Sequence, residues 1–394
     1  MDLSFTKEQE AFRQEVRDFV TAELEAGTFA ISSTGLVAEA SREFSLKMAE
    51  KGWIGLSWPT ECYGQGRSYV DKMIMNEELF KVQAPLGFHF LGDRQVAPAL
   101  IEFGSDWHKE YFLPRIANAT EDSTFCLLFS EPNAGSDLVA VSTTAVEEGD
   151  AYILNGQKTW TSGGHLADWG WILVQTNFDE SVPNHKSCSE FIVDLKSPGV
   201  TIRPIINSAG EVDFNEVFFD NVKIERKNLV GKVNDGFKQI MAQMDFERAG
   251  MERLMQNYPI YSLLVDHMKA MVASGENGEF CGWVKDQVAQ LEIEYNIGRL
   301  LCYRTAWMID SGKRPTSQAA IAKMFCTQLE QRVNDLATKV LGPVSQIREG
   351  VEWTPFPVDL AACYLWGASY TLQGGSVEIL KNIVAQRGLG LPRR

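Results

Sequence analysis

The spacing of apolar residues along the first part of the chain is that of amphipathic helices. Thr6 and Gln9 are spaced as a capping box, and Phe12, Val16 and Val20 follow at steps of four. The same period predicts further helices over Leu36–Lys51, Val70–Lys81 and Gln95–Phe103. We therefore expect an N-terminal helical domain over residues 1–118.

From residue 119 to residue 232 the apolar period changes to two, which is typical of strands. Ala151–Leu154 and Gln157–Thr161 flank Asn155-Gly156, a dipeptide that strongly favours a hairpin turn. Further alternating runs predict strands over Trp169–Val174, Glu190–Asp194 and Asn215–Phe219. This pattern predicts a central antiparallel β domain over residues 119–232.

Helical periodicity returns after residue 232, in runs long enough for a helix bundle. The predicted helices are Asp235–Met255, Tyr261–Ser274, Trp283–Ser311, Ser317–Leu341 and Ser376–Gln386. The chain is therefore expected to be an α+β multi-domain protein, with a C-terminal helix bundle over residues 233–394.

Charge and hydropathy restrict the partners of such a chain. The 37 basic and 52 acidic residues give a net charge of −15, which disfavours nucleic acid and anionic membranes because their phosphates repel it. No apolar run is long enough to span a bilayer. The N-terminus lacks the basic and apolar regions of a signal peptide, so we expect a cytoplasmic protein with no membrane association.

Several kinds of site are unsupported by the sequence. The seven cysteines and five histidines are scattered without ligand spacing, so no metal site is expected. No glycine-rich fingerprint follows a predicted strand, and neither a Walker A motif nor a GxSxG elbow occurs. Nicotinamide, ATPase and serine-hydrolase chemistry of the usual kinds are therefore disfavoured.

Glu247 interrupts an apolar stripe in the predicted helix Asp235–Met255. Phe237, Ile240 and Met244 define a face that, continued by steps of three and four, passes through position 247. A carboxylate on a buried helix face is expected to have a raised pKa, which suits a general base. The alternative is that Glu247 pairs with Arg248 or another cation and is purely structural.

Two further segments could contact a flat ligand. In Phe125–Asp137, apolar residues run into a turn of small residues in which Ser130 and Ser136 supply hydroxyls and amides. Downstream, Trp160 and Ser162 stand beside glycines at a predicted strand end. Each segment also has an ordinary interpretation, because most such turns are only turns and most tryptophans belong to the core.

These segments together resemble the acyl-CoA dehydrogenase family. The resemblance rests on Glu131–Asp137, on Asn155–Lys158 with Trp160 downstream, and on the C-terminal segment Gly374–Pro392. It extends over essentially the whole chain, and the α–β–α order agrees with it. It implies an FAD enzyme that acts on CoA thioesters in lipid or organic-acid degradation.

The resemblance also implies roles for individual residues. Leu127, Phe129, Ser130 and Ser136 match positions along the flavin and its pyrophosphate, while Trp160 and Ser162 match positions at the flavin ring. The remaining matching residues are Gly374, Ser376 and Glu378 for the cofactor, and Arg248 and Ser136 for the substrate. The implied chemistry is removal of the α-proton by a carboxylate while the β-hydrogen leaves as a hydride to FAD.

The position of the base distinguishes branches of the family. Many members carry it where this chain has Gly374, which cannot act as a base. A smaller branch, similar to isovaleryl-CoA and long-chain acyl-CoA dehydrogenases, has it at the position of Glu247. The apolar-stripe argument and the resemblance therefore both indicate Glu247, and they favour a bulky, branched or steroid-like acyl group.

The chain also departs from the family pattern. Met271–Gly275 replaces an Arg-x-x-Phe-Gly motif that reaches the FAD pyrophosphate of a neighbouring subunit, and Pro343 replaces a glycine. The family implies transfer of electrons to electron-transfer flavoprotein and a homotetramer or an α2β2 heterotetramer. Three alternatives stay open: a lyase or desulfinase of this fold, an enoyl-CoA reductase, and a half-site subunit of a heteromeric enzyme.

Overall fold

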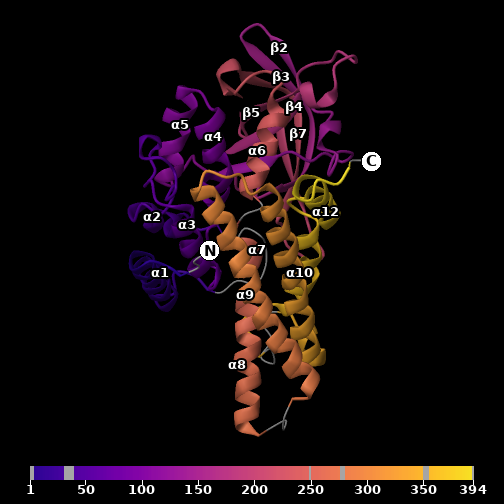
Figure 1. The fold of residues 1–394 in the computed structure, drawn as a ribbon. Coiled ribbons are helices and arrows are strands. Elements are labelled where there is room, and N and C mark those ends of the chain that lie inside the picture. The colour runs from indigo at the N-terminus through magenta and orange to yellow at the C-terminus, as the bar shows by residue number, and fades with distance from the viewer. Residues whose placement is uncertain (1–3, 31–39, 248–249, 276–279, 349–354, 393–394) are drawn as a thin grey trace. The chain divides into compact units, whose positions relative to one another are not determined.

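The computed structural model describes residues 4–30, 40–247, 250–275, 280–348 and 355–392. The chain forms two compact units. The sheet unit comprises residues 39–67 and 85–247, and the bundle unit comprises residues 1–38, 68–84 and 248–394. Figure 1 labels their helices and strands. The division into three domains, at 118/119 and 232/233, stays a prediction.

The sheet unit begins with helical segments and continues into a sheet that ends in a helix. Its helices are α2 (Arg42–Glu50), η1 (Thr60–Cys62), the π-helix η2 (Gly92–Val96), α4 (Ala97–Phe103), α5 (Asp106–Ala117), η3 (Leu138–Ala140), η4 (Asn184–Lys186), η5 (Arg226–Asn228) and α6 (Gly236–Glu247). Its strands are β1 (Phe125–Leu128), β2 (Thr144–Glu148), β3 (Ala151–Ser162), β4 (Trp169–Gln175), β5 (Cys188–Asp194), β6 (Val200–Ile205), β7 (Phe214–Glu225) and β8 (Leu229–Val230).

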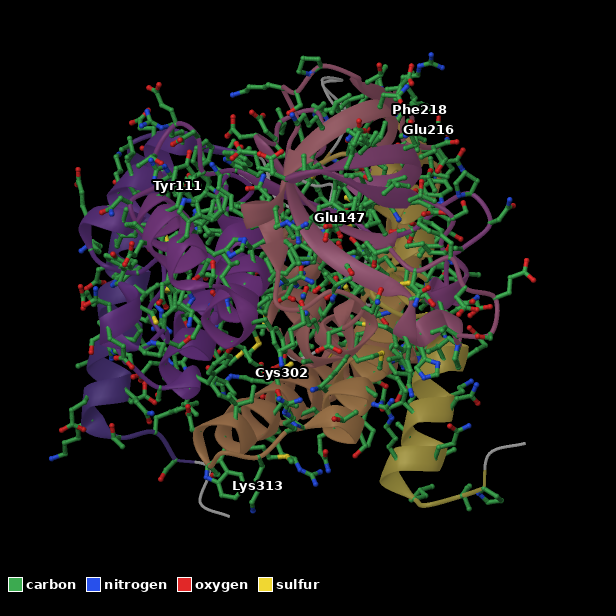
Figure 2. The ribbon with its side chains drawn as sticks, turned by 90° about the horizontal axis from the view of Figure 1, so that it is seen from above. Tyr111, Glu147, Glu216, Phe218, Cys302 and Lys313 are labelled. Carbon is green, nitrogen blue, oxygen red and sulfur yellow. The ribbon has the colours of Figure 1, made fainter. Side chains whose placement is uncertain are left out.

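The strands form one sheet in the order β6-β7-β3-β2-β4-β5-β8, with β1 added beside β4. Pairing is antiparallel except at β1–β4 and at a single bridge between β2 and β4. Along β7 the buried residues Asn215, Val217 and Phe219 alternate with more exposed ones, because successive strand side chains point to opposite faces. Glu216 and Phe218 lie together on the other face (Figure 2). The predicted antiparallel-rich β domain is thus confirmed.

The predicted hairpin at Asn155-Gly156 is wrong. Both residues lie inside β3, where a bulge shifts the register against β7. The Asn155 side chain, which could have shaped a turn, instead accepts a hydrogen bond from the Asn221 backbone N–H on β7 at 2.8 Å. The β2–β3 hairpin turns at Gly149-Asp150, where Gly149 supplies the positive φ of 63° that such a turn requires.

The predicted helix Asp235–Met255 is also wrong in its extent, because α6 ends at Glu247. Gly250 is non-helical, and a short helix, α7, begins only at Glu252. Glycine disfavours helix, and a Cβ at position 250 would lie 1.8 Å from the buried Glu252 carboxylate, so any other residue here requires that side chain to move. The apolar stripe is therefore interrupted after Glu247.

The bundle unit consists of helices from three stretches of the chain. They are α1 (Lys7–Glu25), α3 (Tyr69–Phe80), α7 (Glu252–Met255), α8 (Tyr258–Ser274), α9 (Gly282–Asp310), α10 (Thr316–Leu341), η6 (Gly342–Gln346), α11 (Leu360–Gly367), η7 (Ala368–Thr371), α12 (Val377–Ile383) and the π-helix η8 (Val384–Gly388). The capping box is confirmed, because the Thr6 hydroxyl accepts from the Gln9 N–H and the Gln9 side chain accepts from the Thr6 N–H.

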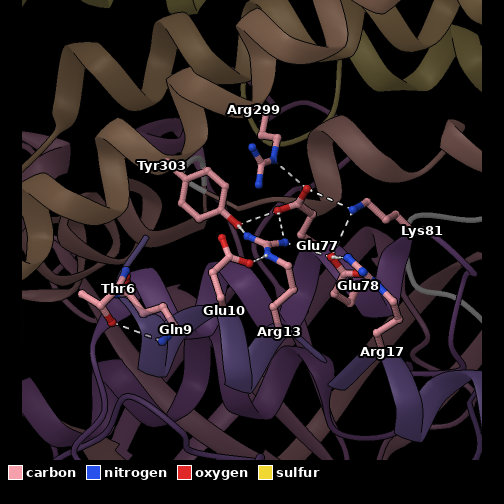
Figure 3. A network of polar contacts seen from close by, with 10 residues as sticks. All are labelled: Thr6, Gln9, Glu10, Arg13, Arg17, Glu77, Glu78, Lys81, Arg299 and Tyr303. Atoms are coloured by element: carbon pink, nitrogen blue, oxygen red, sulfur yellow. Dashed lines mark hydrogen bonds and ion pairs between the residues drawn. The ribbon is translucent and has the colours of Figure 1, made fainter. Parts of the chain in front are cut away.

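A buried ionic network joins α1, α3 and α9 within the bundle unit (Figure 3). The Glu77 carboxylate accepts hydrogen bonds from Arg13 at 2.8 Å, from Arg299 at 2.7 Å and from the Tyr303 hydroxyl at 2.5 Å. Lys81 adds an ion pair to Glu77 at 3.1 Å. Burial alone would raise the pKa of Glu77, but Arg299, Lys81 and Arg13 outweigh it and lower the pKa to about 2.

This network predicts an acid-sensitive fold. A carboxylate with a lowered pKa contributes stability that is present above its unfolded pKa, about 4.5, and is lost as the pH falls through about 2. We expect Glu77→Gln to lower the free energy of unfolding by roughly 3–5 kcal/mol at neutral pH. The difference from wild type should shrink as urea denaturation is repeated towards acid pH. The control is Glu25→Gln, at an exposed position of α1. An equal deficit at every pH would contradict the assignment.

The structure also bears on membranes, metals and thiols. Within the described ranges, no helix is long and apolar enough to cross a membrane, and no cluster of His, Cys, Asp or Glu could hold a metal ion. The cysteines carry free thiols, and Cys302 lies among the bundle helices (Figure 2).

Candidate active site

The predicted turn after β1 is closed by backbone hydrogen bonds. The Glu131 N–H donates to the Ala134 carbonyl at 2.9 Å, and the Ala134 N–H donates back at 3.1 Å. Phe129 and Ser130 enter this turn half-buried, as does Leu127 at the end of β1, whereas Ser136 beyond it is exposed. The turn thus presents a half-buried apolar edge followed by exposed small polar residues.

An ion pair inside the sheet unit fixes the turn to β3. Lys158 on β3 is fully buried, and its ammonium donates to the Glu131 carboxylate at 2.7 Å and to the Phe129 carbonyl at 3.2 Å. Glu131 also accepts from the Ser142 N–H at 2.6 Å and the Thr143 N–H at 3.0 Å. These donors hold the pKa of Glu131 at about 2 although burial opposes them, so the carboxylate is ionised at neutral pH.

Lys158 carries the balancing charge. Burial lowers the pKa of Lys158 to about 8, while the Glu131 carboxylate opposes that shift, so the ammonium stays mostly protonated at neutral pH. Sequence reasoning gave neither residue a role. The only available signal was that Glu131 and Lys158 both stand inside the segments that carry the family resemblance.

Trp160 projects from a bulge at the end of β3. The register against β7 shifts between Lys158 and Thr161, and Trp160 has a φ of 58°, which is strained for a residue with a side chain. Its side chain is 60% exposed, so it is not a core tryptophan. The neighbouring Thr159 N–H donates to the Ser130 carbonyl at 2.9 Å, which brings this segment beside the turn.

The bulge has its own support from β7. The buried Asn215 amide donates to the Thr161 carbonyl at 3.1 Å and contacts the His165 ring nitrogen at 3.1 Å. Ser162 follows, half-buried, as the last residue of β3. The structure therefore brings the turn and the Trp160–Ser162 segment together, as their proposed common role requires.

Helix α6 packs on the same loop. Its Phe237, Ile240 and Met244 form an apolar cluster with Phe129, Ala134 and Leu138, together with β4 and β5 residues. At these positions the apolar stripe expected from the sequence therefore packs against the sheet unit's core. Glu247 is the last residue of α6, but its side chain, like all of Arg248, lies outside the described residues.

The remaining predicted cofactor residues belong to the bundle unit. Gly374 and Gly375 have φ values of 64° and 96°, and the Ser376 hydroxyl caps α12 by accepting from the Ile379 N–H at 3.4 Å. Glu378 is exposed in the first turn of α12. The buried Lys323 donates to the Gly375 carbonyl at 2.9 Å and so supports this turn.

The departure from the family pattern is visible at the end of α8. Met271 and Ser274 occupy its last turn, where the Ser274 hydroxyl donates to the Met271 carbonyl at 3.1 Å, and Gly275 ends the helix in a left-handed conformation. Neither side chain can form an ion pair with a pyrophosphate. The segment therefore ends α8 without the cation that the family motif carries.

The side chains of the sheet unit fit the ring portion of a flavin. Phe129, Ser130, Trp160 and Ser162 offer an apolar surface, hydroxyls and an exposed indole that is held in place by a strained backbone. A Cβ on Gly135 would meet nothing within 4 Å, so the chain leaves open space beside the turn. Residues 271 and 274 provide no comparable support for the pyrophosphate.

The fold and these segments define a flavin-dependent oxidoreductase of α–β–α architecture. Three family models match the chain: "Acyl-CoA dehydrogenase, N-terminal domain" at residues 6–120, "Acyl-CoA dehydrogenase, middle domain" at residues 126–222 and "Acyl-CoA dehydrogenase, C-terminal domain" at residues 234–389. The chain belongs to the acyl-CoA dehydrogenase family, whose members use FAD.

Individual relatives cover the whole chain. Acyl-CoA dehydrogenase IpdE1 of Mycobacterium tuberculosis is 33% identical, with 98% of each chain covered. The structure titled "Tcur3481-Tcur3483 steroid ACAD" matches with a TM-score of 0.89 at 27% identity and complete coverage of both chains. The ChsE4-ChsE5 complex from Mycobacterium tuberculosis matches with a TM-score of 0.85 at 31% identity, again with complete coverage of both chains.

Proposed function

We propose that this enzyme converts an acyl-CoA thioester to its 2-enoyl-CoA, with Glu247 as the base and electron-transfer flavoprotein as the electron acceptor. The observation that carries this proposal is the packing of α6, which ends in Glu247, onto the loop of Phe129 and Ala134. The alternative position for a base holds Gly374, which has no side chain to act with.

Each segment then has a chemical task. When bound, FAD accepts the β-hydrogen of the substrate as a hydride. Glu247 takes the α-proton, while Trp160 and Phe129 offer surface to the flat ring and Ser130 and Ser162 offer hydroxyls to its polar edge. Ser136 and Arg248 are proposed to contact the CoA thioester. The Lys158–Glu131 pair keeps the turn and the strand end in one arrangement.

A bulky acyl group fits this arrangement best. Position 374 carries a glycine, which lacks the carboxylate side chain that many family members have there. The similar structure of the Tcur3481-Tcur3483 protein is titled a steroid acyl-CoA dehydrogenase. We therefore propose a branched, cyclic or steroid-like acyl chain as the substrate class.

Product analysis tests the reaction type. With a steroid-like acyl-CoA and an electron acceptor, we expect catalytic formation of the 2-enoyl-CoA, and without the acceptor only as much product as there is flavin. A lyase or desulfinase needs no acceptor and releases a fragment of the substrate. Turnover without the acceptor, or turnover only with an enoyl-CoA and a reductant, would reject the proposed direction.

A second candidate concerns assembly, and it is favoured by the missing arginine at position 271. The chain is proposed to be one subunit of a heteromeric, α2β2 dehydrogenase, since two similar structures carry two-protein titles. Helix α9 of this chain has an exposed apolar surface of the kind that a subunit interface covers. Four apolar residues at helical spacing form it, with these exposed fractions: Ile293 54%, Ile297 42%, Leu300 44% and Trp307 46%. A homotetramer is the alternative.

The visible spectrum of the purified protein tests this assembly. If a partner chain completes the pyrophosphate site, we expect well under one FAD per chain for the protein alone. Co-expression with the partner should give a larger complex with more FAD per chain. If the protein alone binds one FAD per chain and its assembly contains only one kind of chain, the protein is a homomer instead.

A further inference from the structure

Helix α6 carries two buried polar residues, Gln239 and Gln243, on the side that faces β5 and β8. Gln239, Gln243 and Glu247 are spaced by four, so they succeed one another along one helix face. Gln239 and Gln243 are only 2% and 4% exposed. A buried amide has to be hydrogen-bonded to be tolerated, so each needs a partner at a fixed place.

Both partners lie on neighbouring strands of the sheet. The Gln239 amide donates to the Val230 carbonyl of β8 at 3.2 Å. The Gln243 amide nitrogen lies 3.0 Å and 3.2 Å from the two carboxyl oxygens of Glu190 on β5. Glu190 and Val230 are directly paired in the sheet, so the two contacts hold successive turns of α6 to one point.

The close approach of Gln239 is matched by a glycine. A Cβ on Gly231 would lie 2.3 Å from the Gln239 amide nitrogen, and Gly231 has a φ of 69°. The end of β8 is therefore shaped around this helix face.

Burying a glutamate such as Glu190 in the core of a sheet costs free energy. Glu190 is fully buried, and burial raises its pKa to about 8 although contacts with Trp171 and Gln243 oppose the shift, so the group is largely a neutral acid at neutral pH. Burying a pair of apolar side chains at such a site would cost less free energy. The acid–amide pair instead restrains the geometry of the helix, because a directional hydrogen bond fixes both its rotation and its axial position.

We propose that Glu190 is a positioning residue of the dehydrogenase reaction, which through Gln243 fixes the last turns of α6 and thereby the place of Glu247. This inference rests on the proposed function, in which Glu247 is the base. Gln243 precedes Glu247 by four residues, so a shift of one moves the other. A proton acceptor displaced by about 1 Å loses on the order of 10²-fold in rate, which makes the helix position consequential.

The discriminating variant is the double substitution Glu190→Leu with Gln243→Leu, tested in the holoenzyme. Two leucines remove both members of the acid–amide pair, so neither is left buried without the other, while Trp171 loses its contact with Glu190. We therefore expect the thermal midpoint to fall only slightly and the FAD per chain to stay near wild type. We expect KM to change little, whereas kcat and the rate of flavin bleaching by substrate fall roughly 10- to 100-fold. The single variant Glu190→Gln, which keeps a neutral hydrogen-bonding group, should retain most of the rate.

The outcomes separate this inference from the proposed function. Wild-type kcat in the double leucine variant, or a rate in Glu190→Gln as low as in that variant, would overturn the positioning role. If Glu247→Gln is inactive while the double leucine variant is fully active, only this inference fails. If Glu247→Gln turns over normally, the proposed base and the positioning role both fail.

Discussion

Replacing Glu247 by glutamine is expected to abolish turnover while leaving the cofactor bound. Glutamine preserves the size and most hydrogen bonds of the side chain but cannot accept the substrate α-proton. General bases contribute about 10²- to 10⁴-fold to rates, so kcat should fall by about that factor. The measurement is stopped-flow bleaching of the flavin by substrate, normalised to the FAD bound per chain.

A structural role for Glu247 makes the opposite prediction. If the carboxylate only paired with Arg248 or another cation, its loss would lower the thermal midpoint and the FAD content but leave the rate per bound flavin unchanged. Glu247→Asp is the matched control, because it keeps a carboxylate on a shorter chain. We expect Asp to retain part of the bleaching rate and Gln almost none. A bleaching rate per bound flavin in Glu247→Gln that is close to wild type would reject Glu247 as the base.

Most helices could be predicted from the sequence because their signals are local. The capping box of Thr6 and Gln9 and the apolar periods of α3, α9 and α10 involve residues within one or two turns of each other. The family resemblance similarly depended on short segments. The fold class and the cofactor class therefore followed from neighbouring residues alone.

The errors arose where local signals compete with tertiary contacts. Asn155-Gly156 carries a strong turn signal, but the hydrogen bond from Asn221 on β7 keeps it in an extended strand. The period that extended α6 to Met255 ignored Gly250, which disfavours helix and where a side chain would displace the Glu252 carboxylate. In both cases the decisive partner is distant in the sequence or is a steric limit that periodicity does not register.

The supports of the site were invisible for the same reason. Lys158 and Glu131 are 27 residues apart, and Gln243 and Glu190 are 53 apart. A lysine in a strand and a glutamate in a turn ordinarily face solvent. Only the folded sheet shows that both are buried against each other, so that one pair decides how the turn after β1 and the end of β3 meet.

Removing the Lys158 ammonium is expected to cause the largest loss of stability in the sheet unit. In Lys158→Met the chain keeps a similar length, but the Glu131 carboxylate is left buried with backbone donors and no cation. Breaking one partner of a buried ion pair costs about 3–5 kcal/mol of unfolding free energy. Since the pair holds Phe129 and Ser130 beside β3, we also expect most of the FAD to be lost.

The double variant Glu131→Gln with Lys158→Met isolates the charge from the packing. It leaves no buried charge at this site, so it should recover part of the stability lost in Lys158→Met. In the single variant, burial is expected to raise the pKa of Glu131 above its unfolded value. Its deficit relative to wild type should therefore be smaller in mild acid, where the carboxyl binds a proton, than at neutral pH, where Lys158 of the wild type is still mostly protonated.

Urea denaturation at several pH values, followed by tryptophan fluorescence, measures these differences in the free energy of unfolding. The fully buried Trp171 of the sheet unit is among the reporters. The stability of the wild type has the opposite pH dependence. Because the pKa of Glu131 is lowered, its contribution to the free energy of unfolding disappears as the pH falls from about 4.5 towards about 2. If the double variant is as unstable as Lys158→Met at every pH, packing around the lysine stem rather than its charge joins the turn to the strand.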